Sequence, residues 1–450
     1  MKSFPPRSQP SFEVSHLTVA SSLLTILLAA IPPLIIANGG FAQHALALVA
    51  AVILAAAVRG ADAELTSTAQ LLKRFSVTIL VPAIWMMVQI LPLPFSSLVN
   101  PIWSATSIAL NEPSLRGRIS LDPGATFESL FVYLVYVSLV VSTVIICRDR
   151  HRAETILFVL CAVTTFMSLE VVLGRLDWFA AMTPATDAPM SPFPAAAALA
   201  TVANTALVAR ALERHLHRRD IRNLASIRLW LGVLTGMFGI VVGIIAIAAL
   251  ARYMLLLAAG FGLTAIAFIA AVRRLGFRSW PSAVLFAIVV TIVGALTVPR
   301  LQSGGSSLLG LVTFPQETVA LAGRLLSDAP WLGNGVGTFS VASRAYQGVD
   351  AAEQVIPPST AVLVAIESGR LALVILAGFA AQLFVFMFRG AVRRGRDSFF
   401  ASAAAAGVLI VFCEGFLDAS LASPATRIIV AVMIGLGLAQ SAGRTSGLKR

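Results

Sequence analysis

Long apolar runs separated by shorter polar segments dominate the chain. Runs of about 17 to 25 apolar residues are long enough to cross a bilayer as α-helices. We therefore predict an all-α fold, a polytopic transmembrane helical bundle of about 12 spans that forms a single integral membrane domain over residues 1–450. The predicted spans lie at about residues 17–37, 42–58, 75–93, 127–147, 154–173, 193–210, 229–250, 252–272, 281–299, 361–388, 399–418 and 424–441.

Composition excludes a soluble protein. Apolar residues make up 58% of the chain, charged residues make up 12%, and the mean hydropathy is +0.88. A soluble domain carries roughly 25% charged residues, so too few polar residues are present here to cover a core of this size. The first apolar run contains Pro32 and Pro33 and has no clear small-residue cleavage site, so we predict a retained helix rather than a signal peptide.

The net charge of +12 is explained by its distribution. Most of the 33 Lys and Arg residues fall in the segments on one side of the predicted spans. By the positive-inside rule, that side and both termini are cytoplasmic, and no nucleic-acid partner is expected. The three cysteines and five histidines show no metal-ligand spacing, which predicts no metal site and no cofactor.

Two long segments fall on the opposite, periplasmic side. One is 94–126, and the other is a large loop at about 300–360, between the ninth and tenth spans. In this loop, an apolar stripe at helical spacing (Val319, Ala322, Leu325 and Leu326) predicts a short amphipathic helix that ends at Asp328. The glycine-rich residues 331–339 follow, whose amides could face an anion or simply form a turn.

Six ionisable residues lie inside or beside the outward halves of the spans. Because such residues are costly in a membrane, we expect them to share one polar, water-filled cavity. They are Arg252, Glu367, Arg370, Glu414, Asp418 and Arg427.

The spacing of these six residues in the sequence suggests an ion-pair partner for some of them but none for Arg252. Glu367 and Arg370, three residues apart, could neutralise each other, and Asp418 could form a clamp with Arg427. Arg252 has no carboxylate nearby in the sequence, and a free guanidinium suits a phosphate or diphosphate.

Several short sequence motifs of the chain resemble those of the O-antigen ligase and polymerase superfamily of bacterial envelope-glycan enzymes. These motifs lie at 91–94 with 119–123, at 329–339, at 365–369 and at 414–421. The resemblance implies a multi-pass protein of the bacterial inner membrane. It also implies metal-independent glycosyl transfer at the periplasmic face, from an undecaprenyl-diphosphate-linked oligosaccharide donor to a glycan or lipid A core acceptor. Such a reaction belongs to lipopolysaccharide or exopolysaccharide biosynthesis, and ligase and polymerase activities remain alternatives.

The resemblance also implies site residues. Arginines of the family hold the donor diphosphate, which implies Arg252 with Arg324 or Arg370 as substrate-binding residues. The family's loop histidine is absent, because Pro358 stands at the corresponding position.

Because this histidine is absent, the sequence is compatible with both an enzyme and a protein without catalytic activity. If the chain is an enzyme, the candidates for a catalytic base are Glu367, Asp350 and Glu353. The alternatives are a transporter or flippase of lipid-linked glycan, and a catalytically silent homologue in a polysaccharide assembly complex. Twelve spans with polar residues suit alternating access, but here the charges cluster toward one face.

Overall fold

The apolar runs form long helices, and the described residues contain no strand. The computed structural model describes residues 16–36, 40–60, 65–94, 98–175, 190–217, 224–275, 316–346, 356–393 and 397–442. Its helices are α1 (His16–Ala29), α2 (Ile31–Ile36), α3 (Gly40–Arg59), α4 (Leu65–Arg74), α5 (Ser76–Ile90), α6 (Ile102–Ala109), α7 (Pro123–Ile146), α8 (Arg150–Gly174), α9 (Phe193–His217), α10 (Leu224–Ala249), α11 (Tyr253–Leu275), α13 (Gln316–Asp328), α14 (Phe339–Arg344), α15 (Thr360–Glu367), α16 (Arg370–Arg393), α17 (Ser398–Leu417) and α18 (Pro424–Ser441), with a 3-10 turn, η2, at Ser420–Ala422.

The protein is a multi-pass helical membrane protein. Within the described ranges, eight helices are long and apolar enough to span a bilayer: α7 to α11 and α16 to α18. A ninth span results if α4 and α5, which are bent by 59° relative to each other, are one broken helix. Two shorter apolar helices, α1 and the Gln43–Arg59 part of α3, fall within the first two predicted runs, and the predicted run 281–299 lies outside the described residues.

The prediction of one continuous helix over 361–388 is wrong. The chain breaks after Glu367, and α16 begins only at Arg370. Gly369 between them has φ +94°, a left-handed conformation that interrupts an α-helix. The polar residues 367–370 coincide with the break, but the long apolar stretches on both sides outweigh them in the hydropathy pattern.

Small side chains build the centre of the bundle. Of the eight long spans, α9, α17 and α18 are the most buried and α16 is the least. Buried alanines occupy 195–198 of α9 and 403–406 of α17. Small residues allow membrane helices to approach closely, and this explains why the alanine-rich run predicted at 193–210 forms a central helix.

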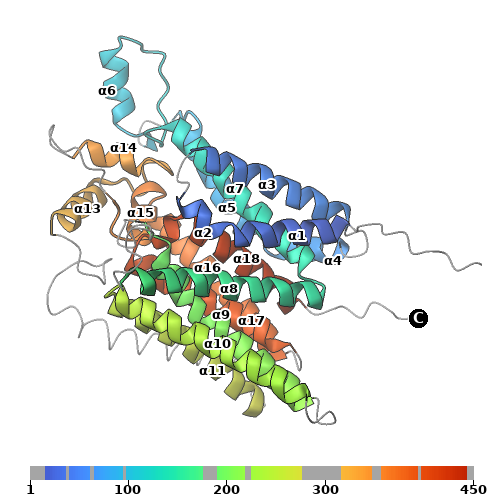
Figure 1. Ribbon diagram of the computed structural model, residues 1–450. Helices are drawn as coiled ribbons and strands as arrows, with labels where there is room; N and C mark the ends of the chain where they lie inside the picture. Colours follow the sequence, from blue (N-terminus) through green and yellow to red (C-terminus); the bar gives the residue numbers. More distant parts are fainter. Residues whose placement is uncertain are drawn as a thin grey trace, which may run out of the picture.

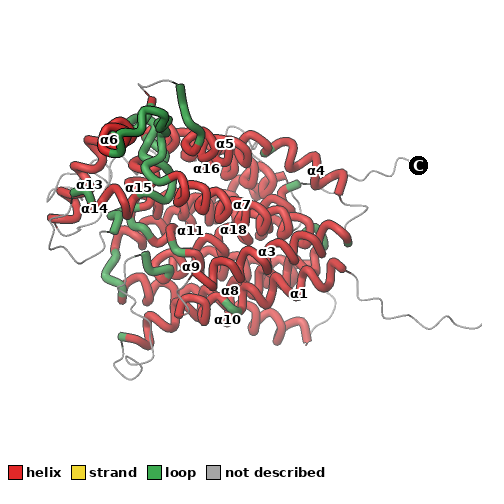
Figure 2. Tube along the Cα trace, turned by 90° about the horizontal axis from the view of Figure 1, so that it is seen from above, coloured by secondary structure: helices red, strands yellow, loops and turns green. Residues whose placement is uncertain are grey.

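A second, smaller apolar cluster lies at one end of the bundle. It joins α13, α14 and α15, which gather at that end in both views (Figures 1 and 2). Ala322 and Leu325 of α13 pack with Phe339 of α14 and with Val362 and Ile366 of α15. The amphipathic helix predicted in the long loop is therefore confirmed as α13.

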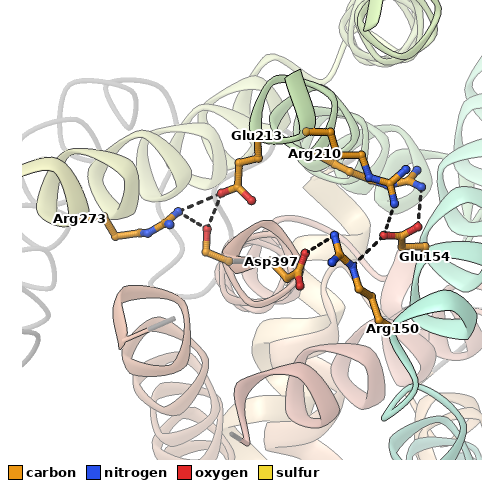
Figure 3. A network of polar contacts seen from close by, with 8 residues as sticks. Arg150, Glu154, Arg210, Glu213, Arg273 and Asp397 are labelled. Atoms are coloured by element: carbon orange, nitrogen blue, oxygen red, sulfur yellow. Dashed lines mark hydrogen bonds and ion pairs between the residues drawn. The ribbon is translucent and has the colours of Figure 1, made fainter. Parts of the chain in front are cut away.

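Side-chain ion pairs hold the opposite end together (Figure 3). Glu154 of α8 accepts from Arg150 Nε (3.2 Å) and from Arg210 of α9 (2.8 Å), and Arg214 also contacts it. Arg150 continues to Asp397, which precedes α17, at 2.8 Å. In a second group, Arg273 of α11 bonds to Glu213 at 3.1 Å. These contacts tie α8, α9, α11 and the start of α17 to one another.

Candidate functional site

The short sequence motifs on which the resemblance rests come together at the end of the bundle that carries α13, α14 and α15, called here the α13–α15 end. The glycine-rich residues 331–339 pass between the start of α7 and the break between α15 and α16. The amide of Leu121 donates to Asn334 O (2.8 Å), while the amides of Asn334 and Gly335 donate to the carbonyls of Ile366 and Glu367 (both 2.9 Å). A three-segment backbone junction is the result.

Two glycines permit the closest crossing in this junction. Gly333 and Gly369 both have positive φ, +79° and +94°. A Cβ on Gly333 would lie 2.2 Å from the carbonyl oxygen of Glu367, and a Cβ on Gly369 would lie 2.2 Å from that of Trp331. Neither position therefore has room for a side chain, which explains why both motifs have glycine there.

The anion that faces the glycine-rich amides is the protein's own Glu367. Its Oε1 accepts from the amide of Phe339 at 3.0 Å, and the amide of Gly337 also bonds to this carboxyl. Burial raises the pKa of Glu367 from its ordinary 4.5 to about 7, although the two amides and the charge of Arg427 oppose this shift. Only 7% of Glu367 is exposed.

The predicted Glu367–Arg370 pair is wrong. An Nη atom of Arg370 donates instead to Leu326 O at 2.7 Å, and its guanidinium lies 5.5 Å from the centre of the Trp331 ring. The break at Gly369 puts Glu367 and Arg370 on different helices, so spacing along one helix does not apply to them. Arg370 joins α16 to the end of α13.

Arg252 is not the free guanidinium that the sequence predicts. Its Nη1 bonds to Oδ2 of Asp418 at 2.7 Å, across 166 positions in the chain. The predicted Asp418–Arg427 clamp is therefore also wrong. Asp418 Oδ1 accepts from the amide of Ser420 (2.9 Å), and Glu414 Oε1 bonds to Ser420 Oγ (2.9 Å).

The carboxylates at this end do not line the expected water-filled cavity. Glu367, Glu414 and Asp418 are 7%, 0% and 3% exposed. Among the residues that the structure describes, Oε2 of Glu414 has no hydrogen-bond partner. These charges nevertheless lie at one end of the bundle. Asp418 O accepts at 2.9 Å from the amide of Thr360 at the start of α15, the helix that ends at Glu367, and the charge of Arg427 acts on Glu367.

The remaining predicted site residues are more dispersed. Arg324 is exposed on α13. Asp350 and Glu353 lie outside the described residues. Within the described ranges, no three His, Cys, Asp or Glu side chains are close enough together to hold a metal ion.

Gln89 is a central residue of this end that the sequence reasoning missed. It is fully buried near the end of α5. Its Nε2 donates to Leu332 O (3.2 Å) and Glu367 O (3.1 Å), and its Oε1 accepts from the amide of Val336 (3.2 Å). An amide side chain in an otherwise apolar span is costly to bury unless it forms hydrogen bonds. The isolated glutamine in this apolar run is therefore the sequence feature that indicates Gln89.

An apolar groove begins at the same end. It has a volume of about 440 Å³ and is lined by residues of α4, α5, α7, α16, α17 and α18. A few polar side chains reach it: Thr78, Tyr133, Tyr136, Thr426 and Arg427. Leu438 lines it eleven residues after Arg427, so it follows α18 for about 16 Å.

Arg427 carries its charge at the end of this groove. Its Nε donates to Leu421 O at 3.2 Å, and its guanidinium lies 5.9 Å from the centre of the Tyr136 ring. Neither partner has a formal charge. Arg427, for which the sequence predicts a clamp with Asp418, therefore lies beside the groove instead.

Two bridges frame the groove between α5 and α16. Thr78 Oγ1 donates to Gln382 Oε1 at 3.0 Å, and Trp85 Nε1 donates to Ser368 O at 2.9 Å. Groove residues of both helices lie between these bridges, Pro82 on α5 and Leu376 and Phe379 on α16 among them. The groove is open to the surface, because its residues Leu376 on α16 and Phe412 on α17 are 37% and 38% exposed.

No family model matches the chain, and no curated protein is significantly similar to it.

Proposed function

We propose that the protein binds a lipid-linked glycan at the α13–α15 end and transfers or polymerises it, as an O-antigen ligase-like glycosyltransferase. The observation that carries this proposal is the groove that ends at Arg427. An apolar channel with one cation at its end complements an amphiphile that has a long hydrocarbon chain and an anionic head. A polyprenyl diphosphate such as undecaprenyl diphosphate has this form.

The charges at this end divide into two kinds under the proposal. Arg427 contacts the diphosphate next to the groove, and Arg252, whose side chain is 30% exposed beside Asp418, supplies a second cation. The exposed Arg324 and Arg370 contact the donor farther from the groove. Guanidinium groups suit this role because they neutralise and orient phosphate oxygens.

The reaction needs little covalent chemistry from the protein. An acceptor hydroxyl oxygen attacks the anomeric carbon, the bond from that carbon to the diphosphate oxygen breaks, and the diphosphate leaves with the electron pair. Arginines stabilise the charge that develops on the leaving group. A carboxylate accepts the hydroxyl proton. Because Glu367 is buried and bonded to two amides, Asp350 and Glu353 are the stronger base candidates.

The proposal also fixes location and orientation. The protein lies in a bacterial inner membrane with its α13–α15 end in the periplasm, where the donor glycan and its acceptor meet. The arginine-rich opposite end and both termini are then cytoplasmic, in agreement with the positive-inside rule. The large loop at about 300–360 is periplasmic and contains α13 and α14.

A reconstituted assay tests the proposal. Purified protein in proteoliposomes receives a glycan on undecaprenyl diphosphate together with an acceptor glycan. Transfer to the acceptor and movement of unmodified donor across the bilayer are scored separately. Wild-type protein should transfer glycan, and Arg427→Ala should reduce transfer at least tenfold.

The matched control is Arg274→Ala, which removes an exposed arginine at the opposite end. It should leave transfer unchanged. Equal transfer by wild type and Arg427→Ala would contradict the role of the groove. Donor movement across the bilayer without any transfer would instead support a flippase.

A further inference from the structure

A projecting segment at 98–118 carries a helix that has no apolar partner within the described residues. Two backbone hydrogen bonds fix its base, from Leu93 N to Gly117 O (3.1 Å) and from Asn100 N to Arg118 O (2.9 Å). Asn100 Nδ2 also donates to Asn334 Oδ1 at 3.1 Å. The segment is therefore tied to the junction below it, and its direction is set by the bundle.

The helix in this segment, α6, is apolar and largely uncovered, although Trp103 is half-buried and its Nε1 donates to Ser120 O at 3.0 Å. None of its residues is buried. Ile108 is 80% exposed, Leu110 directly after the helix is 65% exposed, and Ile102 is 48% exposed. Apolar groups gathered in this way mark a surface that contacts another apolar phase.

The hydroxyl groups of α6 do not make it polar. Ser104 donates to Pro101 O (2.7 Å), Thr106 to Ile102 O (2.8 Å) and Ser107 to Ser104 O (2.9 Å). All three donors are thus satisfied by carbonyls of the same segment, as is common for Ser and Thr in apolar surroundings. Residues 98–111 contain no charged side chain, and Glu112, Arg116 and Arg118 follow directly.

The position of α6 indicates what covers it. It lies at the same end as α13 and α14, beyond the outline of the bundle, and runs across the direction of α1, α3 and α8 (Figure 1). In the view turned by 90°, it is again at that end (Figure 2). If the bundle helices cross a bilayer, a helix in this place lies along the bilayer surface beside the protein.

We infer that α6 is an interfacial anchor that inserts into the lipid surface next to the bundle. Ile102, Ile108 and Leu110 contact acyl chains. The exposed Arg116 contacts lipid phosphates, and Arg118, 5.9 Å from the Trp103 ring, stays with the base of the segment. A lipid surface fits better than a second copy of the chain because α6 offers a partner no free hydroxyl donor and no charge for specific pairing. The inference does not depend on glycan transfer.

Photocrosslinking in vesicles tests this inference. Ile108 is replaced by benzoylphenylalanine, and the full-length protein is reconstituted in phosphatidylethanolamine and phosphatidylglycerol vesicles and irradiated. Mass spectrometry then identifies the adducts. Because Ile108 is 80% exposed, the replacement disturbs no packed neighbour. The matched control places the same probe at Ser114, an exposed polar position in the same segment.

Lipid adducts at Ile108 should exceed those at Ser114 at least fivefold. Leu110 is a second labelling position with the same expected result. Adducts to a second copy of the chain would overturn the lipid contact in favour of self-association. Equal lipid labelling at Ile108 and Ser114, or no lipid labelling at either position, would also overturn it.

Discussion

The two ends of the bundle hold their charged side chains in opposite ways. At the α13–α15 end, the carboxyl of Glu367 is bonded to backbone amides, and that of Glu414 to a hydroxyl. Of the three described carboxyls Glu367, Glu414 and Asp418, Asp418 alone forms an ion pair with an arginine. At the opposite end, Glu154 alone contacts three guanidinium groups (Figure 3). One end depends on the path of the backbone, and the other depends on side chains from separate helices.

Because of this difference, we expect the two ends to be sensitive to different kinds of mutation. The α13–α15 end needs glycines where segments cross, so a methyl group in the wrong place disrupts it. The opposite end needs charge balance, so removal of one carboxylate disrupts it. At the first end, Arg427 makes no hydrogen bond to a carboxylate of the described residues and lines the groove.

Removal of Glu154 should have the largest effect on stability. Glu154→Ala leaves Arg150, Arg210 and Arg214 beside one another without their shared acceptor. Loss of one partner of a fully buried ion pair costs about 3–5 kcal/mol, and we expect a loss at the lower end of this range because the three arginines are 19–45% exposed. Thermal unfolding in detergent measures the change. Arg214→Ala, which removes a side chain that is 45% exposed, should cost less than about 1 kcal/mol. Equal losses would contradict the charge-balance account.

The carboxyl of Glu367 should make stability depend on pH. With a pKa of about 7 in the folded protein against an ordinary 4.5, it holds more protons when folded than when unfolded between these values. Its stabilising contribution is complete below pH 4.5 and is lost as the pH rises through 7. The total is about 3 kcal/mol, since one pKa unit corresponds to 1.36 kcal/mol.

Glu367→Gln should remove this pH dependence. Unfolding of wild type and variant is compared at pH 5 and pH 8. The stability of the variant should change less between the two than that of wild type, while Glu112→Gln, an exposed control, should behave as wild type. An unchanged pH dependence in Glu367→Gln would show that other groups cause it.

A methyl group at Gly369 should damage the backbone junction. Gly369→Ala creates a contact of 2.2 Å with Trp331 O at a positive φ, which costs about 2 kcal/mol. Gly378→Ala on α16 is the control, because nothing lies within 4 Å of its added methyl group. The control should be as stable as wild type or slightly more stable. If both variants unfold alike, the glycines do not hold the junction.

Loss of the Ser420 hydroxyl should have the smallest effect. Ser420→Ala removes the hydrogen bond to Glu414 Oε1, which is worth about 1 kcal/mol. Ser104→Ala on the exposed α6 should change stability by less than about 0.5 kcal/mol. A cost for Ser420→Ala as small as that of the control would mean that Glu414 does not need this donor.

Sequence patterns predict the positions of the helices well and the interaction partners of the charged side chains poorly. Apolar runs identified the long spans, and the stripe at Ala322, Leu325 and Leu326 identified α13. The break at Gly369 was missed because hydropathy does not record backbone conformation. The Arg252–Asp418 pair was missed because 166 positions separate its members and only the tertiary fold brings them together.

Direct labelling of the groove tests the central claim. A photoactivatable polyprenyl diphosphate is added to the reconstituted protein, and its crosslinks are mapped. We predict adducts on groove residues of α7, α16 and α18, which Arg427→Ala and Ala380→Phe inside the groove reduce and which Val374→Phe, on the exposed face of α16, leaves unchanged. Crosslinks that avoid the groove, or that persist equally in all three variants, would contradict the account.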